Sequence, residues 1–227
     1  MNMRVRATHI NVGVVLILLV AAAVALGACG GSDSGNDVPS GIVTTYTDDA
    51  YGFSFEYPAD WTIQRNDEAQ VTAGAAAVAS VGAYDPKGAS SGNSYYDLVE
   101  VSVYQLNGTV DDSIMPQVKE EVQATFAQIE SQAGNWKAAT ELADVSLAGL
   151  KGWTITYDFD LGDMPAKCTF YMLFGGTREY QLLLQASSEN WEENKTVFDA
   201  FLASFKPGTE TPTTSATTAA STSSTVE

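Results

Sequence analysis

Histidine and cysteine are the residue types that this chain of 227 residues most nearly lacks. It has one histidine, His9, and two cysteines, Cys29 and Cys168. A Ser-His-Asp or Cys-His catalytic set needs a histidine beside its nucleophile, and a zinc site of the usual kind needs several His or Cys ligands. A glycine-rich phosphate loop followed by Lys-Ser or Lys-Thr is also missing from the sequence. We therefore expect no catalytic set and no enzyme of these classes.

Basic residues are few as well. The chain has 11 Lys and Arg against 28 Asp and Glu, which gives a formal charge of −17. Proteins that bind nucleic acids neutralise phosphates with patches of Lys and Arg. We therefore exclude nucleic acid as a partner.

The N-terminal segment has the pattern of a secretory signal. Residues 1–11 carry Arg4 and Arg6 and no acid, and an unbroken apolar run follows over residues 12–26. A basic start, an apolar stretch and small residues at the exit are typical of such signals. The run is shorter than the roughly 20 residues of a membrane-spanning helix. The pattern predicts a signal peptide over residues 1–28.

The end of this segment carries a second pattern. Leu26, Gly27, Ala28 and Cys29 resemble the bacterial lipobox. The resemblance implies a diacylglycerol on the Cys29 thiol, cleavage before Cys29 and acylation of the new amino group. Several acyl chains anchor a protein stably, whereas one binds only marginally. We expect a lipoprotein at the extracytoplasmic face of the cell membrane, with no further cofactor; the alternatives are a secreted protein with a chance cysteine and an uncleaved signal anchor.

Removal of the signal changes the composition of the chain. The remainder would have nine basic and 28 acidic residues, a charge of −19, and no histidine. With Cys29 acylated, Cys168 has no partner for a disulfide. Because Cys168 lies in an apolar-rich stretch, we expect a small buried hydrophobe rather than a reactive thiol.

The remainder divides into three parts by composition. Residues 29–44 are rich in Gly, Ser and Asp and are predicted to be a lipidated flexible tether. Residues 207–227 are mostly Thr, Ser, Ala and Pro, a composition typical of disorder. Residues 45–206 are predicted to form one globular domain, which is long enough to bury a core without disulfides.

Strand patterns dominate this domain, and two amphipathic helices interrupt them. Apolar patterns predict strands over 51–57, 98–106, 153–159, 167–174 and 178–187. Gly175 and Gly176, between the last two, predict a hairpin turn. The Ala/Gly-rich stretch 73–83 fits a helix or a strand, and we predict a strand because Gly74 and Gly82 weaken a helix. Apolar spacing predicts helices over 114–129 and 188–204, the first with Asp111, Asp112 and Ser113 as capping residues. This order predicts an α+β fold with a central antiparallel sheet covered by helices.

The two ends of the domain resemble PsbP-like domains. At the start, residues 46–61 combine a Gly-Phe strand with Tyr57-Pro58 and Trp61, and at the end residues 198–206 contain Ser204-Phe205-Lys206. The resemblance implies the Mog1/PsbP-like α/β/α sandwich. That family includes photosystem II extrinsic subunits, a nuclear-transport GTPase partner and many bacterial lipoproteins, which share binding or assembly rather than catalysis. Within it, we expect Trp61 to pack on the core; an aromatic binding site is the alternative.

Carboxylates are plentiful, but only one group stands out. Asp158, Asp160 and Asp163 are close enough in sequence to bind Ca²⁺ weakly, although a solvated hairpin tip fits their surface preference better. We expect a binding or accessory protein with an envelope protein or a small ligand as its partner. A carboxylate-dependent hydrolase of envelope glycans and a carrier of an apolar envelope ligand are the alternatives.

Overall fold

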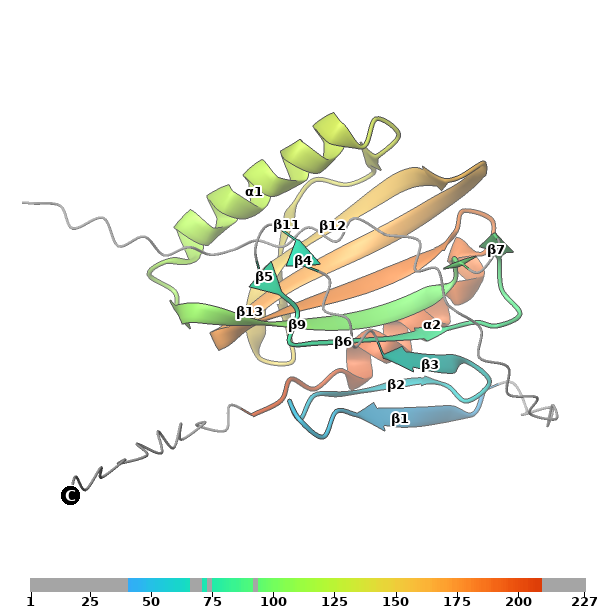
Figure 1. Cartoon of the computed structure of the whole chain (residues 1–227), viewed down its shortest axis with the longest axis horizontal. Coiled ribbons are helices and arrows are strands. Elements are labelled where there is room, and N and C mark those ends of the chain that lie inside the picture. The colour runs from blue at the N-terminus through green and yellow to red at the C-terminus, as the bar shows by residue number, and fades with distance from the viewer. Residues whose placement is uncertain (1–40, 66–70, 73–74, 92–93, 210–227) are drawn as a thin grey trace, which may run out of the picture.

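The computed structural model describes residues 41–65, 71–72, 75–91 and 94–209 (Figure 1). The predicted signal peptide and Cys29 lie outside these residues. The two helices are α1, Met115–Gln132, and α2, Trp191–Ser204. The strands are β1 Val43–Thr47, β2 Ser54–Pro58, β3 Thr62–Arg65, β4 Val71–Thr72, β5 Ala75–Ala76, β6 Ala79–Tyr84, β7 Ser90–Ser91, β8 Ser94–Tyr95, β9 Leu98–Val110, β10 Lys137–Ala138, β11 Ala143–Leu147, β12 Leu150–Leu161 and β13 Met164–Ser187.

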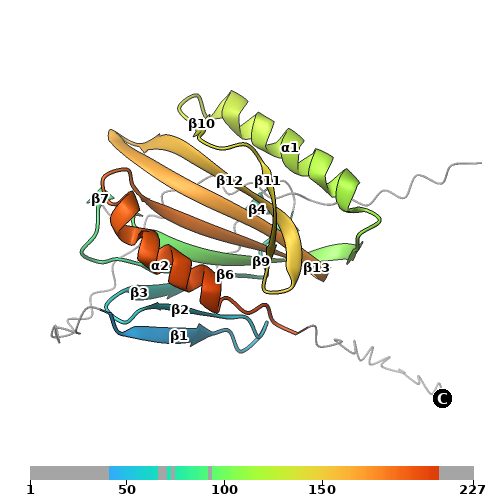
Figure 2. The ribbon, with the colours of Figure 1, turned by 180° about the vertical axis from the view of Figure 1, so that it is seen from behind.

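An antiparallel sheet of seven strands forms the centre of the fold. Its order is β10-β12-β13-β9-β6-β3, and β11 also pairs with β12. The short strands β1 and β2 form a separate antiparallel pair next to α2. The two helices pack on opposite faces of the central sheet, in two separate apolar clusters (Figures 1 and 2). The predicted α+β fold with an antiparallel sheet between helices is therefore confirmed.

Our prediction of a hairpin turn at Gly175 and Gly176 is wrong. Residues 164–187 form a single strand, β13, which turns back from β12 at Gly162 and Asp163 instead. Its pairing with β9 shifts register between Gly176 and Arg178, a β-bulge in which a step of two residues on β13 matches a step of five on β9. The extra residues therefore lie on β9, and Gly176 has a φ of 60°. A glycine adopts this left-handed conformation without the strain of a Cβ. The same residue type thus serves a bulge here rather than a turn.

The bulge exchanges the two faces of β13. Before it, Cys168, Phe170 and Met172 belong to the α1 cluster. After it, Tyr180 and Leu182, which are even-numbered like Cys168, Phe170 and Met172, belong to the α2 cluster. The second half of β13 therefore turns its odd-numbered residues toward the side of α1.

The helix α1 confirms the predicted apolar stripe. Its buried residues are Val118, Val122, Phe126 and Ile129, which pack on β12 and the first half of β13. The predicted caps differ, because Ile114 occupies the N-cap position without a side-chain hydrogen bond. Asp111 instead accepts hydrogen bonds from the backbone N–H and hydroxyl of Ser113 in the preceding turn.

The helix α2 packs on the β1–β2 pair and on the central sheet. Phe198 and Phe201 are its buried aromatic residues, while Trp191 and Leu202 are partly buried against the same cluster. Strand β2 ends at Pro58, as predicted, and Trp61 is buried in this cluster as a packing residue.

Several strands differ from the prediction: β3, β10 and β11 were not predicted, and β12 spans Leu150–Leu161 rather than 153–159. Strand β1, which begins at Val43, was not predicted, and β9 continues to Val110. The predicted strand over 73–83 corresponds in part to β6, and residues 73–74 lie outside the described part. Within the described residues, no helix is long and apolar enough to cross a membrane.

Candidate functional site

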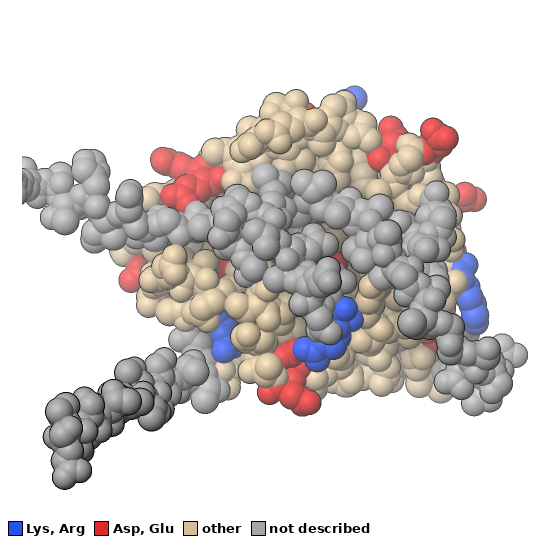
Figure 3. All heavy atoms as spheres, viewed as in Figure 1, with Lys and Arg blue, Asp and Glu red and all other residues tan. Residues whose placement is uncertain are grey.

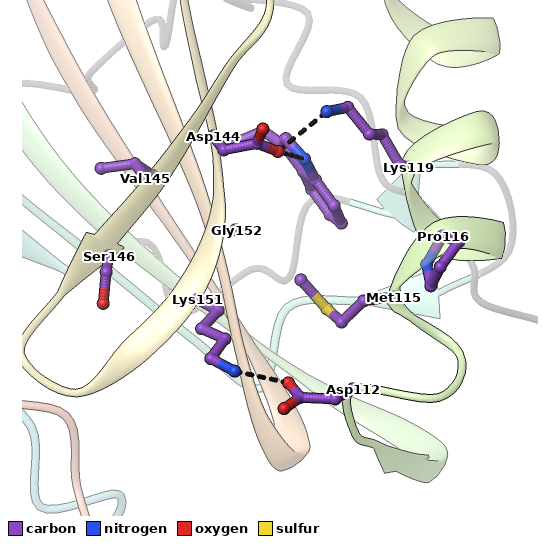
Figure 4. A pocket seen from close by; sticks show the side chains of 10 residues that line it. Asp112, Met115, Pro116, Lys119, Asp144, Val145, Ser146, Lys151 and Gly152 are labelled. Atoms are coloured by element: carbon purple, nitrogen blue, oxygen red, sulfur yellow. Dashed lines mark hydrogen bonds and ion pairs between the residues drawn. The ribbon is translucent and has the colours of Figure 1, made fainter.

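An open groove of about 670 Å³ separates the start of α1 from the β11–β12 hairpin (Figure 4). One wall is helical and the other is the edge of the sheet. The lining residues are Asp112, Met115, Pro116, Lys119, Asp144, Val145, Ser146, Lys151, Gly152 and Trp153. Small-molecule sites in proteins have volumes of about 300–1,000 Å³. The groove is therefore large enough for a small ligand or for a few side chains of a partner.

One ion pair joins the two walls at the β11 end. The Lys119 ammonium on α1 lies 2.8 Å from Oδ1 of Asp144 on β11. The indole N–H of Trp153 donates to the same oxygen over 2.8 Å. These two donors, the Lys119 ammonium first, lower the pKa of the Asp144 carboxyl below its ordinary value. Asp144 is thus held as a carboxylate at the rim of the groove.

A second ion pair crosses the groove at its other end. The Lys151 ammonium, on β12, lies 2.6 Å from Oδ1 of Asp112, in the turn before α1. Both side chains are largely exposed, so the pair adds about 1 kcal/mol or less to stability. Figure 4 shows the two pairs on either side of Met115, which points into the groove between them. The rim therefore carries balanced charge on a strongly acidic protein.

The base of the groove depends on a close contact between β12 and β13. Gly152 lies where a Cβ would come within 1.8 Å of the Met172 carbonyl oxygen, so only glycine fits. Next to it, Trp153 is 3% exposed and packs edge-to-face with Phe174. This packing fixes the indole N–H toward Asp144 and gives the groove a rigid apolar base.

The sequence assigned none of the charged residues of this groove to a site, and Asp112 was predicted only as a capping residue. Lys119 and Asp144 are 25 residues apart, and Asp112 and Lys151 are 39 apart. Residues so far apart in sequence cannot be recognised as ion pairs until the structure places α1 beside the β11–β12 hairpin. Trp153 was predicted as a strand residue, and nothing in its neighbours indicated that its N–H bonds a rim carboxylate.

The residues that the sequence did single out lie elsewhere. Cys29 and the lipobox residues Leu26, Gly27 and Ala28 are outside the described residues. Asp158 and Asp160 are exposed on β12, and Asp163 is exposed in the turn to β13. Their only ion pair within the described residues joins Asp158 to Lys167 at 3.5 Å.

No metal-binding cluster links these aspartates. In the part of the chain that the structure describes, no three His, Cys, Asp or Glu side chains group to hold a metal ion. Cys168 is fully buried in the α1 cluster, where burial raises the pKa of its thiol well above the ordinary value. A thiol held protonated in this way is a poor nucleophile.

Charge is distributed unevenly over the surface as well. On the face shown in Figure 3, acidic and basic side chains lie in small separate groups, mostly near the margin. No continuous basic surface is visible among the described residues of this face.

The fold and the groove together place this protein in the class of α/β/α sandwich proteins with an open site on the surface. The sequence matches the model of the PsbP-like protein family over residues 13–207, so the chain belongs to that family. No curated protein matches the sequence.

Several solved structures have a similar fold. Cyanobacterial PsbP (CyanoP) from Synechocystis is 18% identical, with 76% of this chain and 98% of that chain covered and a TM-score of 0.49. LpqN, described as involved in cell envelope biogenesis of Mycobacterium tuberculosis, is 11% identical, with coverages of 74% and 92% and a TM-score of 0.49. A protein from Bacteroides thetaiotaomicron is 12% identical over 70% of this chain, with a TM-score of 0.46, and the chain spans only 46% of its length.

Proposed function

We propose that this protein is a non-catalytic accessory protein of the cell envelope, held to the membrane through lipid on Cys29. In this proposal the groove between α1 and the β11–β12 hairpin binds a segment of another envelope protein. The groove is the observation that carries the proposal, because it joins an apolar base to a rim of two Lys–Asp pairs.

The two Lys–Asp ion pairs at the rim suit a site that binds and releases a partner protein. An exposed ion pair contributes little to folding, so opening it costs little. Each opened pair offers one cation and one anion at the mouth of the groove. A segment with an acidic and a basic side chain on either side of an apolar residue complements this arrangement. We therefore assign the groove to a partner protein whose segment has this pattern.

Cross-linking from inside the groove tests the proposal in intact cells. A photoreactive benzoylphenylalanine replaces Ser146, which is exposed on the groove wall. The matched control carries the same group in place of Glu192, which is exposed on α2 at the opposite face. We expect one protein, identified by mass spectrometry, to be joined to the Ser146 variant and not to the Glu192 variant.

The identified protein must then bind the groove in purified form. A peptide that covers its cross-linked segment should bind the full chain and compete with the intact partner. Equal cross-linking from both positions would contradict the proposal. Extraction of a bound lipid with no protein cross-link would favour the carrier alternative, and hydrolysis of envelope glycans by the purified chain would favour the enzyme alternative.

A further inference from the structure

A second polar site lies on the central sheet, away from the groove. It is built from side chains of β6, β9 and β13 that share one face, and its members are Ser80, Glu100, Ser102, Tyr104, Glu179 and Gln181. All but Glu100 are buried, and Glu100 is partly buried. Polar groups at this density are unusual in a buried sheet face. The proposed function in the groove leaves these residues without a role.

The β-bulge between β13 and β9 creates this face. Past the bulge, Tyr180 and Leu182 turn to the α2 cluster, so Glu179 and Gln181 turn to the other side. The register places Glu179 directly opposite Tyr104 on β9. Side chains of directly opposed residues on one face of a sheet are neighbours. The carboxyl of Glu179 and the hydroxyl of Tyr104 therefore belong to the same site.

Each of the two carboxyl groups accepts hydrogen bonds from neighbours on this face. Oε1 of Glu100 lies 2.9 Å from the Ser80 and Ser102 hydroxyls, which donate to it. Oε1 of Glu179 accepts a hydrogen bond of 2.7 Å from the amide of Gln181. Ser102 and Gln181 are themselves directly opposed partners. Ser80, Ser102 and Gln181 thus form one row across three strands, with Glu100 bonded to its Ser80–Ser102 side and Glu179 to its Gln181 side.

Among the described residues, two oxygens of the site have no hydrogen-bond partner. They are Oε2 of Glu179 and the hydroxyl of Tyr104, on residues that are 0% and 1% exposed. In the described part of the chain, no Lys or Arg forms an ion pair with Glu100 or Glu179. Burial of a carboxyl without a counterion or a donor is costly. Among the described residues, neither carboxyl therefore has a cation beside it, and Oε2 of Glu179 has no hydrogen-bond donor.

Burial has the same effect on both carboxyls. It raises the pKa of Glu179 to about 7 and also raises the pKa of Glu100, which the Ser102 and Ser80 hydroxyls partly counteract. A cation placed between these groups would reverse the shift, because it favours their charged form.

We propose that Glu100, Glu179 and Tyr104 form a binding site for a small ligand that carries a protonated primary amine. An ammonium group has three N–H donors, and the site offers it three acceptors: Oε2 of Glu179, the Tyr104 oxygen and the Glu100 carboxylate. Hydrogen bonds from an ammonium to a carboxylate are among the strongest in proteins. The ligand reaches the site beside Glu100, the member that is only partly buried.

A matched pair of small probes tests this site. Ethanolamine supplies the ammonium group, and ethylene glycol is its uncharged counterpart of similar size. In titrations of the full chain in amine-free phosphate buffer, we expect ethanolamine to give saturable NMR shifts at the amides of residues 100–104 and 179–181. Ethylene glycol should shift none of them.

Two substitutions separate a specific site from the general acidity of the chain. Glu179→Gln, which keeps the shape and the bond with Gln181, should weaken ethanolamine binding at least tenfold. Glu192→Gln removes the same charge from an exposed position on the opposite face and should leave the binding unchanged. Absence of saturable shifts, equal response to ethylene glycol, or equal weakening by both substitutions would overturn the proposal.

Discussion

The buried carboxyl of Glu179 should make the stability of the protein fall as the pH rises. Burial raises its pKa from the ordinary value of 4.5 to about 7 in the folded state. Between these two values the folded state binds more protons than the unfolded state, so each rise in pH lowers the free energy of unfolding. A tenfold difference in proton affinity corresponds to about 1.4 kcal/mol. The full effect of Glu179 is therefore about 3 kcal/mol, lost between about pH 4.5 and pH 7.

The substitution Glu179→Gln removes this titration and keeps an acceptor for the Gln181 amide. We expect the variant to match the wild type near pH 4.5 and to exceed it by about 3 kcal/mol at pH 8. Urea unfolding at a series of pH values gives both free energies by linear extrapolation. The difference between the two proteins isolates Glu179, because all other titrating groups, Glu100 included, are common to both. Parallel pH profiles would show that Glu179 has an ordinary pKa and would refute the reasoning.

Three further predictions concern other parts of the chain. Gly152→Ala should lower the free energy of unfolding by about 3 kcal/mol in urea, because its Cβ meets the Met172 carbonyl oxygen; an unchanged midpoint would contradict the close strand contact. Ala148→Asn should raise the free energy of unfolding by about 0.5–1 kcal/mol, which is measured as a higher melting temperature. The reason is that Ala148 and Gly149 both have positive φ in the two-residue β11–β12 turn, where Asn-Gly is preferred. Cys29→Ala should abolish lipid attachment, read as release of the chain from the membrane fraction; unchanged processing and attachment would show that another segment anchors it.

The sequence was a good guide where one face of an element is apolar along its whole length. The alternation over residues 153–159 predicted β12, and the spacing of four apolar residues predicted α1. It failed at Gly175 and Gly176, since a pair of glycines between two apolar stretches is typical of a hairpin as well as of a bulge. Only the pairing of β13 with β9 distinguishes the two.

That ambiguity also hid the site around Glu179. With a hairpin at residues 175–177, the sequence does not reveal that Glu179 faces the same side as Glu100 and Tyr104. Likewise, the groove needs α1 to lie beside the β11–β12 hairpin, and no local pattern gives that distance. Residues that meet across long sequence separations have no signature in one sequence, whereas the lipobox-like pattern around Cys29 is contiguous; lipid attachment at Cys29 stays a prediction.

The affinity of the cross-linked partner for charge-reversed chains tests the central claim most directly. Lys119→Glu places an acid beside Asp144 in the groove, and Lys195→Glu makes the same change at an exposed position on α2. If the groove binds the partner, the dissociation constant should rise about tenfold for Lys119→Glu, about 1.4 kcal/mol, and stay at the wild-type value for Lys195→Glu. Equal dissociation constants for the wild type and Lys119→Glu would show that the partner binds elsewhere.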